Sequence, residues 1–225
     1  MTYASAVSNG AASPPLRRVL GWLAILLFLE VALVNVVAFS WPIASGIYAG
    51  DDVRLAISLM RPLLAVTRTI GTLCAIALAG CSIALARREP HPAVRAFVTV
   101  AIAQALVASV CCGIRWVWPP IPHPLSVLLG LLFDTVLVAI CASMLQIARA
   151  SRRVRIVAAI AVLLAVLDAG PTALPLLVSE PAFEALNDVP AYDRSVVIIS
   201  TASWFAAVLT VWFARKAIPI EPSAS

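Results

Sequence analysis

Residues 125–147 read LSVLLGLLFDTVLVAICASMLQI, and this stretch decides the fold class of the chain. It is almost entirely apolar, and Asp134 is the one charged residue within it. An α-helix rises about 1.5 Å per residue, so roughly 20 apolar residues cross the ~30 Å hydrocarbon core of a bilayer. The stretch therefore predicts a membrane-spanning helix.

Five further stretches of the same kind flank this one, at residues 19–39, 63–86, 96–114, 156–178 and 196–214. The whole chain is 62% hydrophobic and only 12% charged, whereas soluble domains carry about 25% charged residues. The first stretch is too long for the apolar region of a secretory signal, which has about 7 to 15 residues, so we expect an uncleaved span. The sequence predicts an all-α polytopic membrane bundle of six transmembrane helices with no soluble domain.

Basic residues gather on one side of the expected membrane. In six-span topology eleven lie on the face that carries both chain ends, namely Arg17, Arg18, Arg87, Arg88, Arg95, Arg149, Arg152, Arg153, Arg155, Arg215 and Lys216. The other face holds four arginines and most of the acidic residues. The positive-inside rule makes the richer face cytoplasmic. We therefore expect cytoplasmic tails at 1–18 and 215–225, with the bundle at 19–214.

The amino-acid composition also indicates the kind of organism, the membrane and the partners of this protein. Fifteen of the sixteen basic residues are arginine and alanine is abundant, which favours a bacterial protein of the inner (cytoplasmic) membrane. The net charge of +5 sits beside apolar spans, so membrane orientation explains it better than nucleic-acid binding. The expected partners are the bilayer itself and either a membrane-protein partner or a second copy of this chain.

The sequence contains no recognisable catalytic or cofactor signature. His91 and His123 lie in loops on opposite membrane faces, so they cannot share a metal ion. The five cysteines all fall in apolar stretches without a C-x-x-C pair, which indicates small buried residues rather than a redox site. We expect no metal and no cofactor, and the absence of nucleophile and phosphate-binding motifs argues against an enzyme.

Four ionisable residues within the spans, Glu30, Arg68, Asp134 and Asp168, are the candidate site. A charge at the bilayer centre is costly unless it is paired or hydrated. Counting along the helices places Glu30 and Asp134 about 16 Å, Asp168 about 18 Å and Arg68 about 22 Å from the cytoplasmic surface of the hydrocarbon core. Asn35 and Gln104 add polar groups within the spans.

We expect Arg68 to pair with one of these acids, first Asp168 and then Asp134, and one or two of the acids to be protonated or to hold a cation. Gly170, Pro171 and Pro175 follow Asp168 and are expected to break or kink the fifth span, so that backbone carbonyls face a cavity.

Three functions fit these features. The first is transport of a small solute or ion, with or without proton coupling, through the four-residue site. The second is a non-catalytic accessory, assembly or sensory subunit whose acids are structural and whose longer non-cytoplasmic loops, at 40–62 and 179–195, bind a partner. The third is a membrane-embedded enzyme.

Overall fold

The computed structural model describes residues 14–43, 53–117, 123–177 and 190–218, and all regular secondary structure in these ranges is α-helical. The helices are α1 (Pro14–Ile43), α2 (Val53–Ala86), α3 (Pro92–Val117), α4 (His123–Ile147), α5 (Arg152–Leu177) and α7 (Pro190–Ala217). The predicted all-α class is confirmed. The non-cytoplasmic loops proposed as contact surfaces fall partly outside the described residues.

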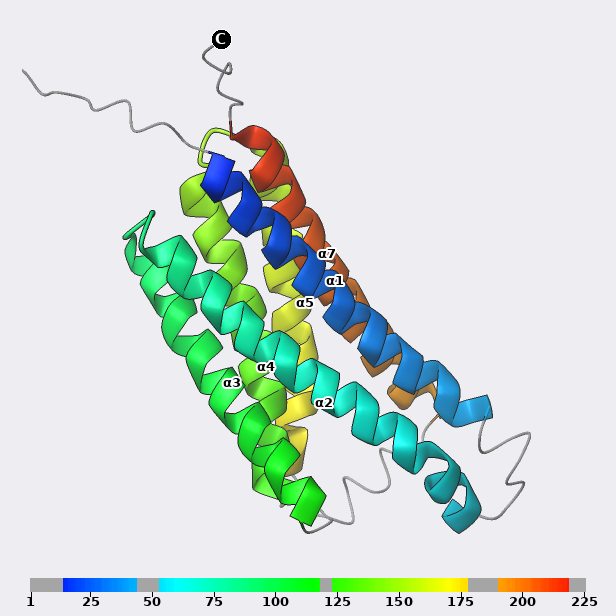
Figure 1. Ribbon diagram of the computed structural model, residues 1–225. Coiled ribbons are helices and arrows are strands. Elements are labelled where there is room, and N and C mark those ends of the chain that lie inside the picture. The colour runs from blue at the N-terminus through cyan, green and yellow to red at the C-terminus, as the bar shows by residue number, and fades with distance from the viewer. Residues whose placement is uncertain (1–13, 44–52, 118–122, 178–189, 219–225) are drawn as a thin grey trace, which may run out of the picture.

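The helices form an antiparallel bundle closed into a ring (Figure 1). Each helix packs against the next along the chain, α1 packs against α7 to close the ring, and α4 also contacts α7 across it. The start of α1, the end of α7 and the two short connections α2–α3 and α4–α5 all lie at one end of the bundle (Figure 1). That end carries the eleven basic residues named above, and we call it the basic end.

Five of the six helices are long and apolar enough to cross a membrane, over Met60–Ala86, Pro92–Ile114, Val127–Ile147, Arg152–Leu174 and Val197–Ala217. The chain is a multi-pass membrane protein. Over its described residues, helix α1 does not meet the same standard. The predicted count of six spans is therefore supported only roughly.

The half of the bundle nearer the basic end is closely packed. Its interior holds large side chains that are fully buried, among them Leu20, Leu23, Leu27, Leu85, Phe97, Leu137, Ile140, Met144 and Val154. The Ser143 hydroxyl on α4 donates to the carbonyl oxygens of Ala139 and, across to α3, Ala93 at 2.8 and 3.2 Å. Lipid is as apolar as leucine, so this close fit rather than water exclusion holds the helices together.

Prolines within α2 and α5 do not interrupt these helices. Helix α2 continues through Pro62, and α5 continues through Gly170, Pro171 and Pro175 to Leu177. The helix is therefore not broken after Asp168, and the expected kink there stays a prediction. A proline removes one helical hydrogen bond, but packing against neighbouring helices and side-chain hydroxyls can compensate within a membrane. The Thr172 Oγ1 atom donates to the Asp168 carbonyl at 3.1 Å, next to the Leu167 carbonyl that Pro171 leaves without its helical donor.

Candidate functional site

A cavity of about 450 Å³ lies among α1, α2, α3 and α4. Most of its lining residues come from the half of each helix farther from the basic end, which we call the cavity half, and Gly71 and Thr72 lie just past the middle of α2. The lining is mainly apolar, formed by Glu30, Leu33, Leu64, Thr67, Arg68, Gly71, Thr72, Ala108, Cys111, Cys112, Leu129, Gly130 and Phe133. This is the size and character of a pocket for a small organic molecule.

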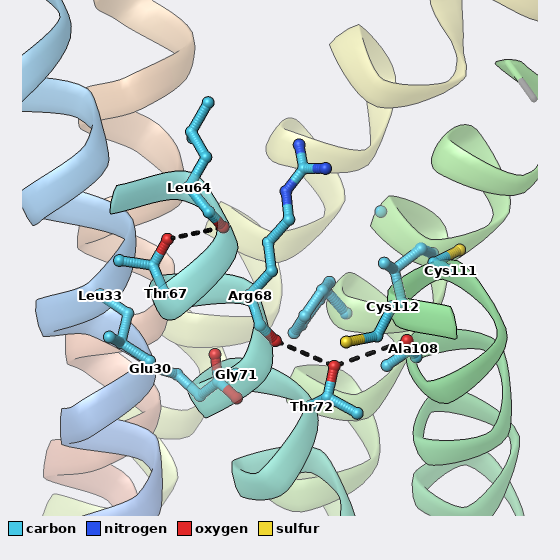
Figure 2. A pocket seen from close by; sticks show the side chains of 13 residues that line it. Glu30, Leu33, Leu64, Thr67, Arg68, Gly71, Thr72, Ala108, Cys111 and Cys112 are labelled. Atoms are coloured by element: carbon cyan, nitrogen blue, oxygen red, sulfur yellow. Dashed lines mark hydrogen bonds between the residues drawn. The ribbon is translucent and has the colours of Figure 1, made fainter. Parts of the chain in front are cut away.

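The cavity follows from how the helices cross. Helix α2 packs against α1 and α3 but not against α4, α5 or α7 within the described residues. It runs obliquely, so its Val53 end stands well away from the ends of α3 and α4 in the cavity half (Figure 1). The Thr72 hydroxyl donates to the Ala108 carbonyl of α3 at 3.5 Å and to the Arg68 carbonyl of its own helix at 2.9 Å (Figure 2). The space beyond this α2–α3 contact remains open.

Glu30 is the acidic residue in the lining of the cavity. The residue is 7% exposed, and its Oε1 atom is buried without a hydrogen-bond partner among the described residues. Its Oε2 atom lies 3.8 Å from where a Cβ atom would sit on Gly71, so the carboxyl group rests against the bare backbone of α2 (Figure 2). A buried acid without a partner is costly, which makes it ready to bind a proton or the cationic group of a ligand.

Arg68 lines the same cavity but does not pair with an acid. Its side chain is exposed and extends away from Glu30 toward the level of Leu64 (Figure 2). No ion pair joins it to another described residue. The expected pair with Asp168 or Asp134 is not present, because α2 does not contact α5 and reaches α4 only across the cavity.

Asp134 and Asp168 pair with each other instead. Asp134 on α4 and Asp168 on α5 are 6% and 5% exposed, and their carboxyl groups are hydrogen-bonded to one another. The Ser200 hydroxyl on α7 donates a second hydrogen bond to Asp168. The Oδ2 atom of Asp134 has no hydrogen-bond partner among the described residues, and two buried carboxyl groups next to each other oppose a state in which both are charged.

The acid pair lies directly behind the α4 wall of the cavity. Phe133, which precedes Asp134, lines the cavity and packs edge-to-face on Trp204 of α7 with ring centroids 5.6 Å apart. One turn along α4, Gly130 is so close to α5 that a Cβ atom there would meet Thr172 Cγ2 at 2.6 Å. The four ionisable residues thus divide between the cavity (Glu30, Arg68) and the α4–α5–α7 interface (Asp134, Asp168).

The two supporting polar residues have different surroundings. Asn35 on α1 accepts a hydrogen bond from Thr201 Oγ1 on α7 at 3.4 Å and donates to the Val31 carbonyl at 2.8 Å. Gln104 is fully buried, and neither polar atom of its amide has a partner among the described residues. It lies four and seven residues before Ala108 and Cys111 and so continues the cavity-facing side of α3 toward the basic end.

Several contributors to the site were not among the predicted site residues. Gly71 and Gly130 shape the cavity, Ser200 binds Asp168, and Phe133 separates the cavity from α7. A Gly71, Ala75, Ala79 repeat marks α2 for close helix packing in the sequence, and Ala75 and Ala79 are indeed buried. That pattern is the one signal in the sequence that pointed to any of these residues.

Metal binding has no support among the described residues, where no group of three His, Cys, Asp or Glu side chains could hold an ion. His91 instead contacts Arg149, with its Nε2 atom 3.1 Å from Nη2 of that arginine, and so ties the α2–α3 connection to the end of α4. His123 is the first residue of α4, and its side chain lies outside the described part.

Comparison with protein-family models, with curated proteins and with solved structures found no match to this chain.

Proposed function

We propose that this protein transports a small, largely apolar solute with a cationic group across the membrane, coupled to movement of a proton. The observation that carries the proposal is the unpartnered Glu30 carboxyl group in a cavity of about 450 Å³. Such a cavity, which is partly open, has room for a small molecule, and one well-placed polar group would orient it.

Glu30 is the solute-binding group in this proposal. Its Oε1 atom has no partner within the described protein, and an ammonium group of the solute would supply one. Arg68 lies at the same cavity with its guanidinium directed away from Glu30 (Figure 2), where it would repel a second cation and favour a solute with one positive charge. The leucines and Phe133 would hold the apolar body of the solute.

The Asp134–Asp168 pair is the proton-coupling group. Two neighbouring acids bind a proton more tightly when they are close together, so a change in their separation would favour uptake or release of a proton. Solute binding against Phe133 and Gly130 would press on the α4 wall in front of this pair and so change the α4–α5 distance. Gln104 provides the next polar group toward the basic end, so a cooperative shift of the helices would pass the solute from Glu30 past Gln104.

Flux measurements in proteoliposomes test this function. Vesicles that contain the protein and a trapped pH dye are exposed in turn to small aliphatic amines, aromatic amines and monovalent inorganic cations. We expect at least one organic cation to cause a saturable proton flux that is lost in Glu30→Gln and in Asp134→Asn. If no cation produces saturable flux and a stoichiometric partner protein co-purifies with the chain, the accessory-subunit function replaces transport.

A further inference from the structure

We infer that the seam between α1 and α7 at the basic end binds a phosphate group, held between the guanidinium groups of Arg17 and Arg215. This site lies at the opposite end of the bundle from the cavity and does not depend on the transport proposal.

Arg215 is held in place by groups on both helices. Its Cζ and Nε atoms lie 3.5 and 3.6 Å from where a Cβ atom would sit on Gly21 of α1, so its guanidinium group rests against α1 where that helix lacks a side chain. The Arg215 Cζ atom is also 5.5 Å from the centre of the Trp212 ring, over which Lys216 Nζ lies at 5.1 Å. These contacts fix the position of Arg215 without neutralising its charge.

Arg17 is the second arginine at the seam between α1 and α7. It lies four residues before Gly21 and therefore on the same face of α1 as the glycine that Arg215 contacts. Helices α1 and α7 pack against each other along this seam. The backbone of Arg17 thus lies about one helical turn along α1 from the place where the Arg215 guanidinium group rests.

Both arginines have donors without acceptors. The Nε atoms of Arg17 and Arg215 are buried and have no hydrogen-bond partner among the described residues. Glu89 is the one acidic residue in the described part of the basic end, and it forms no ion pair with either of them. Two neighbouring positive charges with unused donors form an unfavourable arrangement that an anion would relieve.

The chemistry of the site favours a phosphate group over other anions. A guanidinium group offers donors in a planar fork that matches two oxygens of one phosphate, and two such groups can bind opposite sides of a tetrahedral anion. Trp22 (61% exposed) and Trp212 (41% exposed) mark the level of lipid headgroups, where aromatic residues are enriched. An anionic lipid headgroup and free phosphate share this chemistry, and basic pockets between spans are known to bind such headgroups.

Lipid titration of the purified protein tests this site. The detergent-solubilised chain is titrated separately with short-chain phosphatidylglycerol, short-chain phosphatidylcholine and inorganic phosphate, and binding is followed by tryptophan fluorescence and thermal unfolding. Phosphatidylglycerol should bind, and Arg17→Gln or Arg215→Gln should each weaken that binding by about tenfold or more. Arg152→Gln removes the same charge from an exposed position at the same end and should change binding less than about twofold.

The remaining outcomes separate the two sources and the role of the guanidinium fork. If phosphatidylglycerol does not bind, but inorganic phosphate binds and its binding is weakened by the Arg17 and Arg215 variants, the site is one for a soluble phosphate. Arg17→Lys and Arg215→Lys retain the charge, so they test the fork even if the glutamine variants fold poorly, and they should also weaken binding. If Arg17→Gln and Arg215→Gln weaken binding no more than Arg152→Gln does, the inference is overturned.

Discussion

The basic-end half and the cavity half of the bundle are built from the same helices but are packed differently. In the basic-end half, large residues such as Phe97, Leu137 and Met144 are fully buried and fill the interior. In the cavity half, Gly71, Gly130 and Ala108 border a space of about 450 Å³. One half is closely packed, while the other leaves room for a small molecule.

This difference in packing indicates that the basic-end half contributes most to stability, whereas the cavity half is suited to binding. A packed interior loses free energy when any large side chain is removed, because the surrounding helices relax only partly. An unpartnered acid beside a cavity lowers the stability of the ligand-free protein. Replacing that acid with an apolar residue should therefore raise the free energy of unfolding. The cavity half should therefore tolerate, or even benefit from, changes that the basic-end half cannot accept.

The largest loss of stability should come from removing a large buried side chain in the basic-end half. Phe97→Ala removes a fully buried ring and should lower the free energy of unfolding by about 3 to 5 kcal/mol. Phe205 is 48% exposed on the lipid-facing side, so Phe205→Ala is the matched control and should cost less than about 1 kcal/mol. Thermal unfolding in detergent measures both. Equal losses in the two variants would contradict the packing difference.

A smaller loss should follow from adding one methyl group where α4 meets α5. Gly130→Ala would place Cβ 2.6 Å from Thr172 Cγ2 and should cost about 1 to 3 kcal/mol of unfolding free energy. Thr172→Ser removes that methyl group, so the double variant should regain most of the loss. Gly113→Ala in the same half has no atom within 4 Å of the added Cβ and serves as a neutral control. A Gly130→Ala variant as stable as this control would place α5 farther from α4.

Glu30 should behave in the opposite way to the packed residues. Glu30→Leu replaces a buried acid that lacks a partner, so the free energy of unfolding should rise by about 1 kcal/mol while cation-driven proton flux is lost. Glu30→Gln keeps the shape of the side chain and controls for packing. Chemical unfolding and flux are measured on the same preparations. A clear loss of stability in Glu30→Leu would show that the carboxyl group has a structural partner.

The smallest effect is expected at Arg68. Because the side chain is exposed and forms no ion pair with a described residue, Arg68→Ala should change the free energy of unfolding by less than about 0.5 kcal/mol. The Arg68→Ala, Asp168→Asn double variant should then be no more stable than Asp168→Asn alone. Recovery of stability in the double variant would instead establish the Arg68–Asp168 pair that the sequence predicted.

The sequence was sufficient for the helices because span length and apolarity are properties of single segments. The apolar run at 125–147 lies entirely within α4. Proline positions were less informative. Neighbouring helices set whether Pro62 or Pro171 ends a helix, and both of these helices continue.

The pairing of the charged residues could not be predicted, for a geometrical reason. Counting residues along a span gives depth in the membrane but not the direction in which a side chain points across the bundle. Asp134 faces α5 and α7 and Arg68 faces the cavity, and this depends on which helices are neighbours in the ring. The sequence alone does not reveal which helices are in contact. It therefore identifies the four ionisable residues but not the pairing of Asp134 with Asp168.

The native cysteines allow the most direct test of the central claim that the cavity admits water and solute. Cys112 lines the cavity, whereas Cys141 is fully buried in the packed half. A charged, membrane-impermeant methanethiosulfonate applied from each side of sealed vesicles, with modified peptides read by mass spectrometry, reports which thiols meet water. We predict that Cys112 reacts only from the side opposite the basic end, that a transported cation slows this reaction, and that Cys141 stays unmodified. Reaction of Cys141 at the same rate as Cys112, or no reaction of Cys112 from either side, would show that the cavity does not admit water and solute selectively.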